Sequence, residues 1–192
     1  MAERLTAKAL NAACPYATDG EIDWLQAWAR EQAQEQRSPA WQHRRPPPRA
    51  VIIGCGPGVM ALALLEANPD IDLYVVENDT FHWFDEHLKQ AGLGELAWTA
   101  LLGESEDIGP TWDNGPIDLL IIDGDHSEEG VIADIRAWWA HVRSGGTVVF
   151  DDYYRVGAEW DGVRSGFAKE MAQRNDWQTL AAVDSFTVLK KL

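Results

Sequence analysis

Cysteine is scarce in this sequence, and its scarcity limits how the chain can be stabilised. Only two cysteines occur among 192 residues, Cys14 and Cys55. Two such residues provide neither a disulfide framework nor a CxxC metal site. We therefore expect two reduced thiols.

Cationic side chains are also few. Lys and Arg number 16 against 31 Asp and Glu, which gives a formal net charge of −15. Proteins that bind nucleic acids or anionic membranes take much of their affinity from Lys and Arg beside phosphates. We therefore expect no nucleic-acid partner and no membrane partner, and a small-molecule partner is favoured.

Long apolar runs are missing as well. No stretch approaches the roughly 18 apolar residues of a membrane span, and the first residues, MAERLTAKALNAACPY, contain no apolar segment of signal-peptide length. We expect a cytoplasmic protein. The 46% hydrophobic content, with 10 Trp, is enough to form the core of one domain.

The N-terminal part separates into a helix and a connector. Residues 19–36, DGEIDWLQAWAREQAQEQ, carry apolar side chains at helical spacing, and RSPAWQHRRPPPR then reads as an extended connector because proline cannot continue a helix. We expect residues 1–48 to form a helical extension with a Pro-rich connector, and residues 49–192 to form the main domain. The Trp-rich face around Trp24 and Trp28 predicts a lid over the functional site or a dimer contact, so homo-oligomerisation is an open alternative.

Short apolar runs alternate with amphipathic helices from Arg49 onward. This alternation predicts an α/β fold, a Rossmann-like doubly wound and mostly parallel sheet of seven strands. The last two strands are separated by too few residues for a helical crossover, so we expect a C-terminal antiparallel hairpin. The expected strands lie within 50–55, 72–78, 96–103, 117–123, 145–152, 177–183 and 185–191.

A glycine-rich turn follows the first of these strands. In VIIGCGPGVMA, small residues would let the backbone approach a ligand and leave the amides of a helix N-terminus free, although a tight turn alone also favours glycine. Glu77 ends the next strand, roughly 20 residues later, where a carboxylate can accept hydrogen bonds from ribose hydroxyls. Together these features indicate a cofactor that contains a nucleoside.

The spacing of the glycines is GxGxG, whereas a dinucleotide site has GxGxxG. In this respect the chain resembles the class I S-adenosylmethionine-dependent methyltransferases, over about residues 49–192. One departure is Ile52, where many members of that family carry an acidic residue. The resemblance implies S-adenosylmethionine as the cofactor, with contacts from Gly54, Cys55, Gly56, Gly58, Glu77, Asn78, Glu104, Ser105 and Asp123.

A second motif, IDGDHSEEGV, precedes a helix and a strand that ends in Asp151 and Asp152. It resembles the Methyltransferase-24 group and the related macrocin- and aminocoumarin-type sugar O-methyltransferases, with Glu128 in place of the usual Tyr and Ser144 in place of the usual Pro. The resemblance implies that Asp123, Asp151 and Asp152 bind a divalent metal. It also implies that Asp125 or His126 acts on the hydroxyl of the acceptor.

Physical chemistry supports this metal site independently. Adjacent parallel strands would bring Asp123 and Asp151 side by side, and their repulsion is costly unless a cation lies between them. Carboxylate oxygens suit a hard ion, so we expect Mg²⁺. Asp125 could instead cap the following helix, as could Ser127.

Three functions follow from these residues. The favoured one is a metal-dependent O-methyltransferase that acts on a small molecule, with a sugar or a sugar-bearing natural product as the candidate acceptor. A glycosyltransferase with Asp123-Gly124-Asp125 as a DxD motif and a noncatalytic S-adenosylmethionine-binding protein are the alternatives. The acceptor itself does not follow from the fold or the cofactor.

Overall fold

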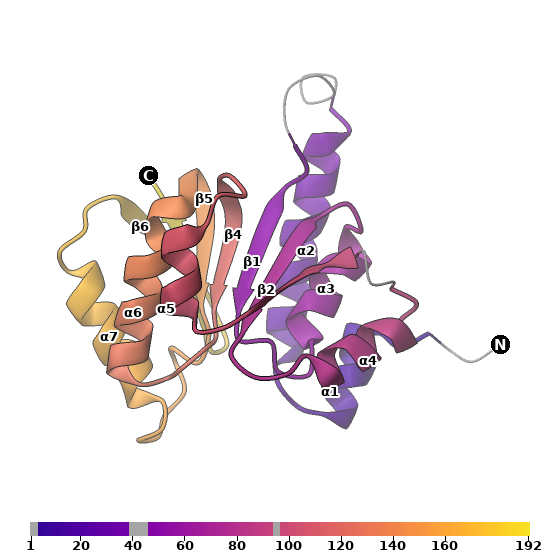
Figure 1. The fold of residues 1–192 in the computed structure, drawn as a ribbon, viewed down its shortest axis with the longest axis horizontal. Coiled ribbons are helices and arrows are strands. Elements are labelled where there is room, and N and C mark those ends of the chain that lie inside the picture. Colours follow the sequence, from indigo (N-terminus) through magenta and orange to yellow (C-terminus); the bar gives the residue numbers. More distant parts are fainter. Residues whose placement is uncertain (1–3, 39–45, 94–96) are drawn as a thin grey trace.

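The computed structural model describes residues 4–38, 46–93 and 97–192. Most of the predicted connector, residues 39–45, lies outside these ranges. One seven-stranded sheet runs through the molecule in the order β3-β2-β1-β4-β5-β7-β6 (Figure 1). The strands are β1 (Arg49–Ile53), β2 (Asp72–Glu77), β3 (Thr99–Leu102), β4 (Ile117–Ile122), β5 (Val142–Phe150), β6 (Trp177–Val183) and β7 (Phe186–Lys191).

The first five strands are parallel, and the last two are antiparallel to their neighbours. β1 pairs in parallel with both β2 and β4, whereas β7 pairs antiparallel with β5 and β6. The predicted doubly wound sheet with a C-terminal hairpin is therefore confirmed. The strand order reverses between β1 and β4, which is where open α/β sheets bind their ligands.

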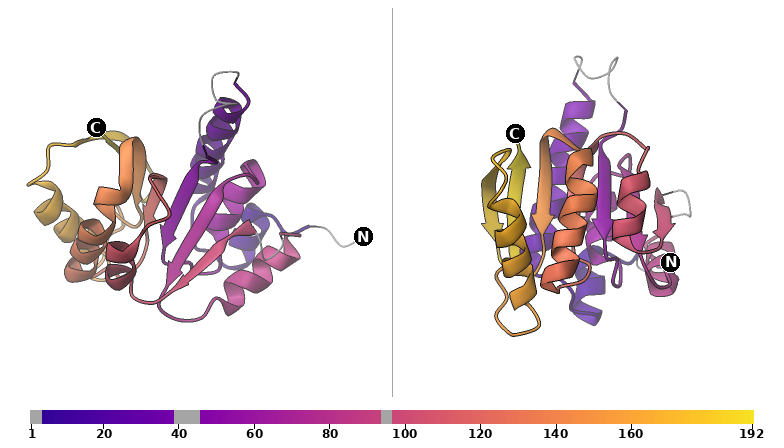
Figure 2. Two further views of the ribbon diagram at one scale, coloured as in Figure 1. Left: turned by 45° about the horizontal axis from the view of Figure 1, so that its top comes forward. Right: turned by 60° about the vertical axis from the view of Figure 1, so that its left-hand side comes forward.

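Helices cover both faces of the sheet, as Figure 2 shows. On one face lie α1 (Ala7–Ala13), α2 (Asp19–Gln36), α3 (Val59–Ala67) and α4 (His82–Gln90), and on the other lie α5 (Ser105–Ile108), α6 (Glu128–Trp138) and α7 (Asp161–Met171). Successive strand residues point to opposite faces. Ile52 thus belongs to one buried cluster and Ile53 to the other.

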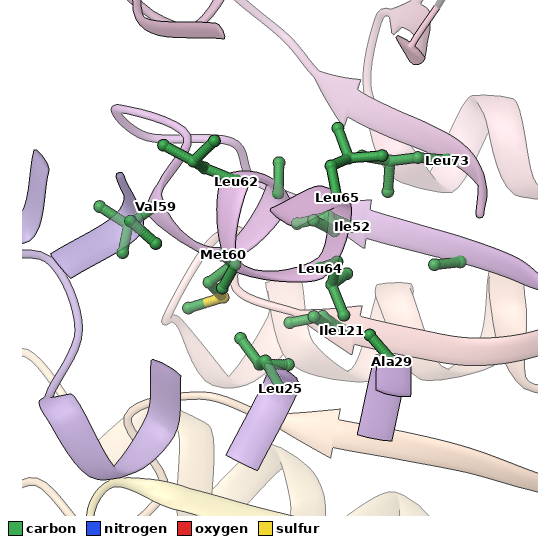
Figure 3. Close-up of a cluster of buried hydrophobic side chains, with 14 of the residues drawn as sticks. Leu25, Ala29, Ile52, Val59, Met60, Leu62, Leu64, Leu65, Leu73 and Ile121 are labelled. Carbon is green, nitrogen blue, oxygen red and sulfur yellow. The ribbon is translucent and has the colours of Figure 1, made fainter. Parts of the chain in front are cut away.

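The helix α2 is part of this core. Its residues Ile22, Leu25 and Ala29 are fully buried, and in Figure 3 Leu25 and Ala29 lie beside α3 and the sheet. Trp24 packs edge-on against Phe186 of β7, with ring centroids 6.5 Å apart. The apolar face of α2 is thus used inside the molecule. This corrects our expectation that the apolar face is left open for a lid or a dimer contact. Homo-oligomerisation and the domain boundary at Arg49 stay predictions.

Across residues 4–38, 46–93 and 97–192, no helix combines the length and the apolar character that crossing a bilayer requires.

Candidate active site

The glycine turn leaves β1 at the carboxyl edge of the sheet, and its backbone conformation requires glycine. Gly54 has φ +82, and a Cβ there would lie 2.0 Å from the carbonyl oxygen of Asp123. Gly58 is the N-cap of α3, with φ +92. Residues 54–58 therefore form a tight loop, the glycine loop, which lies against the end of β4.

Glu77 lies beside the glycine loop, as the sequence predicts. One carboxylate oxygen, Oε2, accepts a hydrogen bond from the Cys55 amide at 3.1 Å, and Oε1 accepts one from the Asn78 amide at 2.9 Å. The Asn78 side chain donates to both carboxylate oxygens of Glu104 at 3.3 Å. The carboxylate of Glu77 is thus held in place by backbone donors at the ends of two strands.

A cavity of about 420 Å³ opens between these residues and β4. It is lined by eight of the nine residues predicted to contact the cofactor, all except Gly58, which lies at the start of α3: Gly54, Cys55, Gly56, Glu77, Asn78, Glu104, Ser105 and Asp123. Tyr16, Asp125 and Asp134 also line it. The structure therefore gathers most of the predicted cofactor residues around one space.

The predicted metal ligands lie at the adjoining strand ends. Ile122 of β4 pairs with Phe150 of β5, so the next residues, Asp123 and Asp151, emerge side by side as predicted. Asp152 follows with φ 57, an uncommon backbone conformation that Asp tolerates better than most residues. Asp123, Asp151 and Asp152 are only 6%, 3% and 4% exposed. We refer to these three residues together with His126 as the acidic cluster.

His126 brings an imidazole to these carboxylates. Its Nε2 lies 3.5 Å from Asp123 Oδ1 and 3.5 Å from Asp152 Oδ2. This nitrogen is buried and has no hydrogen-bond partner among the described residues. Asp123, His126 and Asp152 each offer a ligand atom within 4.8 Å of the others, so this set fits a divalent cation.

Asp151 makes different contacts. Its Oδ1 accepts hydrogen bonds from the Asp152 amide at 2.6 Å and from the Ser185 hydroxyl at 2.8 Å. The same hydroxyl lies 2.5 Å from the buried carboxylate of Glu21 on α2. The structure therefore places Asp151 beside the other two acids, with one oxygen engaged by its neighbours.

Burial of these acids opposes their ionisation. Burial, followed by the charges of Asp151 and Asp152, raises the pKa of Asp123 well above its usual value. Burial and the charge of Asp152 raise the pKa of Asp151 to about 7. A bound cation would favour the charged forms and offset this cost.

The two candidate bases differ in their surroundings. Asp125 accepts hydrogen bonds from the Ser127 amide at 2.9 Å and from the Ser127 hydroxyl at 2.6 Å, and these bonds lower the pKa of Asp125. Ser127 is itself the N-cap of α6. Burial lowers the pKa of His126, which keeps the imidazole neutral near pH 7. His126 is therefore better placed to accept a proton.

The segment that follows β5 covers the acidic cluster. Arg155 Nε lies 2.5 Å from Asp152 Oδ1, and the Arg155 guanidinium lies 5.0 Å from the centroid of the Trp160 ring. The Trp160 ring is in turn 4.8 Å from that of His126. Trp160 and Arg155 therefore form a wall beside the imidazole.

Comparison with known proteins identifies the family. Residues 51–153, more than half of the chain, match the Methyltransf_24 family, described as a methyltransferase domain. The chain belongs to this family. The matched residues of the Methyltransf_24 domain include the glycine loop, Glu77 and the acidic cluster.

Other proteins resemble this Methyltransf_24 chain in sequence or fold. Uncharacterized protein R132 of Acanthamoeba polyphaga mimivirus is 48% identical over 50 residues, which are 25% of this chain and 23% of that protein. This chain thus spans about a quarter of the curated relative that it matches.

Two solved structures share the fold at low identity. The O-methyltransferase TomG of Streptomyces achromogenes, involved in tomaymycin synthesis and in complex with SAM, has 19% identity and a TM-score of 0.71 over 96% of this chain and 87% of its own. MycE methyltransferase of the mycinamycin biosynthetic pathway, in complex with Mg and SAH, has 18% identity and a TM-score of 0.62 over 98% of this chain and 55% of its own.

Some residues of the Methyltransf_24 site were not predicted from the sequence. Asp134 lies on α6 and lines the cavity, where it accepts a hydrogen bond from the Ser105 hydroxyl. Trp138 Nε1 donates to the Ser105 carbonyl at 3.1 Å. The helical spacing of Val131, Asp134 and Trp138 on one buried face could have identified Asp134, because an acid on an apolar face needs a partner.

Proposed function

We propose that this protein is an S-adenosylmethionine-dependent O-methyltransferase that uses a divalent metal and acts on a hydroxyl group of a small molecule. The observation that carries the proposal is the position of Asp123. It lines the cavity shared with Glu77 and the glycine loop, and it also lies 3.5 Å from His126 in the acidic cluster. A methyl donor and a hydroxyl acceptor could therefore meet at the end of β4.

The proposed cofactor residues divide the cavity among them. Backbone amides of the glycine loop would face the methionine part, because this loop lies at the N-terminus of α3. Glu77 would accept the ribose hydroxyls, and Glu104 and Ser105 would border the adenine. Asn78 keeps Glu104 close to Glu77 through its side-chain hydrogen bonds. The complexes of TomG with SAM and of MycE with SAH support a cofactor of this kind.

Asp123 and Asp152 would hold the cation, with Asp151 as the third acidic ligand. Carboxylate oxygens are the ligands that Mg²⁺ prefers in proteins. When bound, Mg²⁺ would polarise the acceptor hydroxyl and lower its pKa. The Mg in the MycE complex supports this part of the proposal.

His126 is proposed as the general base. Its Nε2 faces the same point as Asp123 and Asp152, so it could accept a proton from a hydroxyl held there. Asp125 is proposed to hold the loop before α6 in place by accepting hydrogen bonds from Ser127, the N-cap of that helix. A DxD glycosyltransferase is disfavoured by this arrangement, because Asp125 Oδ2 bonds to Ser127 and does not join Asp123.

The acceptor is proposed to be a sugar or a sugar-bearing natural product. Trp160 supports this choice because its ring borders His126, and aromatic rings offer sugars a flat apolar surface. The predictions of a cytoplasmic location and of no nucleic-acid or membrane partner remain part of this proposal.

Calorimetry and methyl transfer test the proposed function together. We expect the protein to bind S-adenosylhomocysteine but not sugar nucleotides, and to transfer labelled methyl groups into a metabolite extract in a reaction that chelator stops reversibly. Binding of sugar nucleotides instead would favour the glycosyltransferase. Cofactor binding without transfer to any acceptor would favour the noncatalytic protein, and transfer at full rate in excess chelator would exclude the metal.

A further inference from the structure

Tyr16 lies directly on the glycine loop. A Cβ at Gly56, where φ is +43, would lie 2.3 Å from the Tyr16 ring carbon Cζ and 2.7 Å from its hydroxyl oxygen. The side chain lines the cavity although the residue is 37% exposed. The segment between α1 and α2 therefore contributes an aromatic ring to the site formed by the sheet.

Asn11 fixes the position of this segment. Its Oδ1 accepts hydrogen bonds from the Tyr16 amide at 2.9 Å and from the Ala17 amide at 3.0 Å. Its Nδ2 donates to the Ala17 carbonyl at 2.7 Å. Three hydrogen bonds with one side chain thus hold the backbone of Tyr16 and Ala17 in place.

The Tyr16 ring lines the same cavity as Glu77 and Asp123. Burial and the nearby carboxylates of Asp123, Asp151 and Glu77 raise the pKa of its phenol, which is therefore neutral at physiological pH. We refer to the glycine loop, Glu77 and the other cavity-lining residues proposed to bind the cofactor as the cofactor side. Glu77 of the cofactor side and two acids of the acidic cluster thus act on the same ring. A cation placed beside the ring would be attracted by these carboxylates and by the face of the ring.

The chemistry of methyl transfer places such a cation here. If Glu77 holds the ribose and the acceptor hydroxyl lies beside His126, the reacting sulfur must lie between them and close to Gly56. The methyl donor is a positively charged sulfonium, whereas the product S-adenosylhomocysteine is a neutral thioether. An aromatic ring at this point could therefore distinguish the two forms.

We propose that the Tyr16 ring covers the sulfonium and binds the charged donor in preference to the neutral product. This inference rests on the proposed function. It assigns to Tyr16 a positioning and discriminating role that none of the predicted cofactor residues has. Such a ring would make release of the product easier once the sulfonium charge has gone.

Calorimetry with S-adenosylmethionine and S-adenosylhomocysteine tests the proposal. We expect Tyr16→Leu to weaken binding of the charged donor by roughly 2- to 30-fold, the range of a cation over an aromatic face, and to leave binding of the product within about 2-fold. Tyr16→Phe should keep the parent's ratio because it keeps the ring. Tyr154→Leu is the matched control, since Tyr154 is 46% exposed and does not line the cavity.

Other outcomes would overturn the proposal. Equal losses for both ligands in Tyr16→Leu would mean that the ring only fills space, and a loss in Tyr16→Phe as large as in Tyr16→Leu would assign the effect to the hydroxyl. In either case the parent still binds both ligands, so the proposed function stands. A parent that binds neither ligand overturns the proposed function and this inference with it.

Asn11 gives a second, independent measurement. Asn11→Ala should cause part of the same donor-selective loss, because the loop would no longer hold the ring on Gly56. In the Tyr16→Leu background the same change should add nothing to that loss. Additive losses would show that Asn11 does not act through Tyr16.

Discussion

The cofactor side and the acidic cluster hold their carboxylates in opposite ways. Glu77 accepts hydrogen bonds from the amides of Cys55 and Asn78, so its carboxylate is held by the backbone itself. Asp123, Asp151 and Asp152 are buried together, and burial raises the pKa of each of them. Glu77 therefore has its hydrogen-bond donors without a ligand, whereas the three acids of the acidic cluster would need a cation to balance their charges.

This difference indicates what each side is built to do. A carboxylate held by backbone donors is rigid and can recognise neutral hydroxyl groups with little rearrangement. Acids with raised pKa values, beside an imidazole whose Nε2 is buried, form a site whose charge depends on a bound ion or proton. In the proposed function, recognition of the cofactor would take place in the cavity and the chemistry would take place at the acidic cluster. Asp123, which lines the cavity, belongs to both sides.

Both sides depend on the N-terminal helices, so the largest expected effect is their removal. Deleting residues 1–48 should unfold the protein, because it exposes the core beneath α2 and removes Glu21 from Ser185. Circular dichroism and chemical denaturation would detect the loss. A truncated protein that unfolds cooperatively and binds S-adenosylhomocysteine would contradict this expectation.

Single substitutions on α2 sharpen the same point. Leu25 is fully buried, so Leu25→Ala should lower the free energy of unfolding by about 2–5 kcal/mol. Asp23→Ala is the matched control, because the Asp23 side chain is 60% exposed in its ion pair with Lys8. That change should cost less than about 1 kcal/mol.

The next largest effect should come from His126. His126→Ala should lower kcat by roughly 10²–10⁴-fold, the contribution of a general base, and leave the affinity for S-adenosylhomocysteine unchanged. Asp125→Asn should lower kcat much less, because Asp125 acts through Ser127. Single-turnover kinetics and calorimetry would separate the two quantities.

A reversed result would be informative. If Asp125→Asn shows the large loss in kcat and His126→Ala does not, Asp125 is the base. If His126→Ala instead abolishes binding of Mn²⁺ or Mg²⁺, His126 is a metal ligand and the acidic cluster holds its ion by Asp123, His126 and Asp152.

On the cofactor side, Glu77→Ala should weaken S-adenosylhomocysteine binding. Each lost hydrogen bond to a charged group is worth about 1.5–3 kcal/mol, or roughly 10- to 150-fold in Kd. Glu77→Gln should lose less, since one side-chain oxygen remains to accept hydrogen bonds. An unchanged Kd in Glu77→Ala would remove this residue from the site.

The sequence was sufficient for the parts of the molecule that depend on local pattern. Alternating apolar runs and helices predicted the sheet, and parallel pairing alone predicted that Asp123 and Asp151 would lie side by side. The identity of the metal ligands and of the base stays a prediction, because residue types do not fix side-chain directions.

Contacts between distant segments could not be predicted in this way. Glu21 accepts a hydrogen bond from Ser185 across 164 positions, and Tyr16 reaches Gly56 from a loop without any periodic pattern. The amphipathic pattern of α2 indicated that one face would be covered, but a pattern of this kind does not name what covers it. The structure supplies that partner as α3 and the sheet.

The smallest expected effect concerns Asp134, an acid of the cofactor side whose surroundings resemble those of the acidic cluster. Burial raises the pKa of Asp134 to about 6, whereas an unfolded chain releases this proton near pH 3.9. The neutral form is therefore favoured by folding, and its contribution to stability is lost as the pH rises from about 4 through about 6. Asp134→Asn should remove this pH dependence. At pH 8 the free energy of unfolding of the variant should therefore exceed that of the parent by about 1–2 kcal/mol, and each kcal/mol should raise Tm by roughly 2–4 °C. Thermal unfolding of parent and variant at pH 5 and pH 8 measures this difference in stability. Asp107→Asn is the control, because Asp107 of α5 is exposed. If the Tm difference between parent and variant is the same at both pH values, Asp134 is ionised at both. Raised carboxyl pKa values would then be confined to the acidic cluster and absent from the cofactor side.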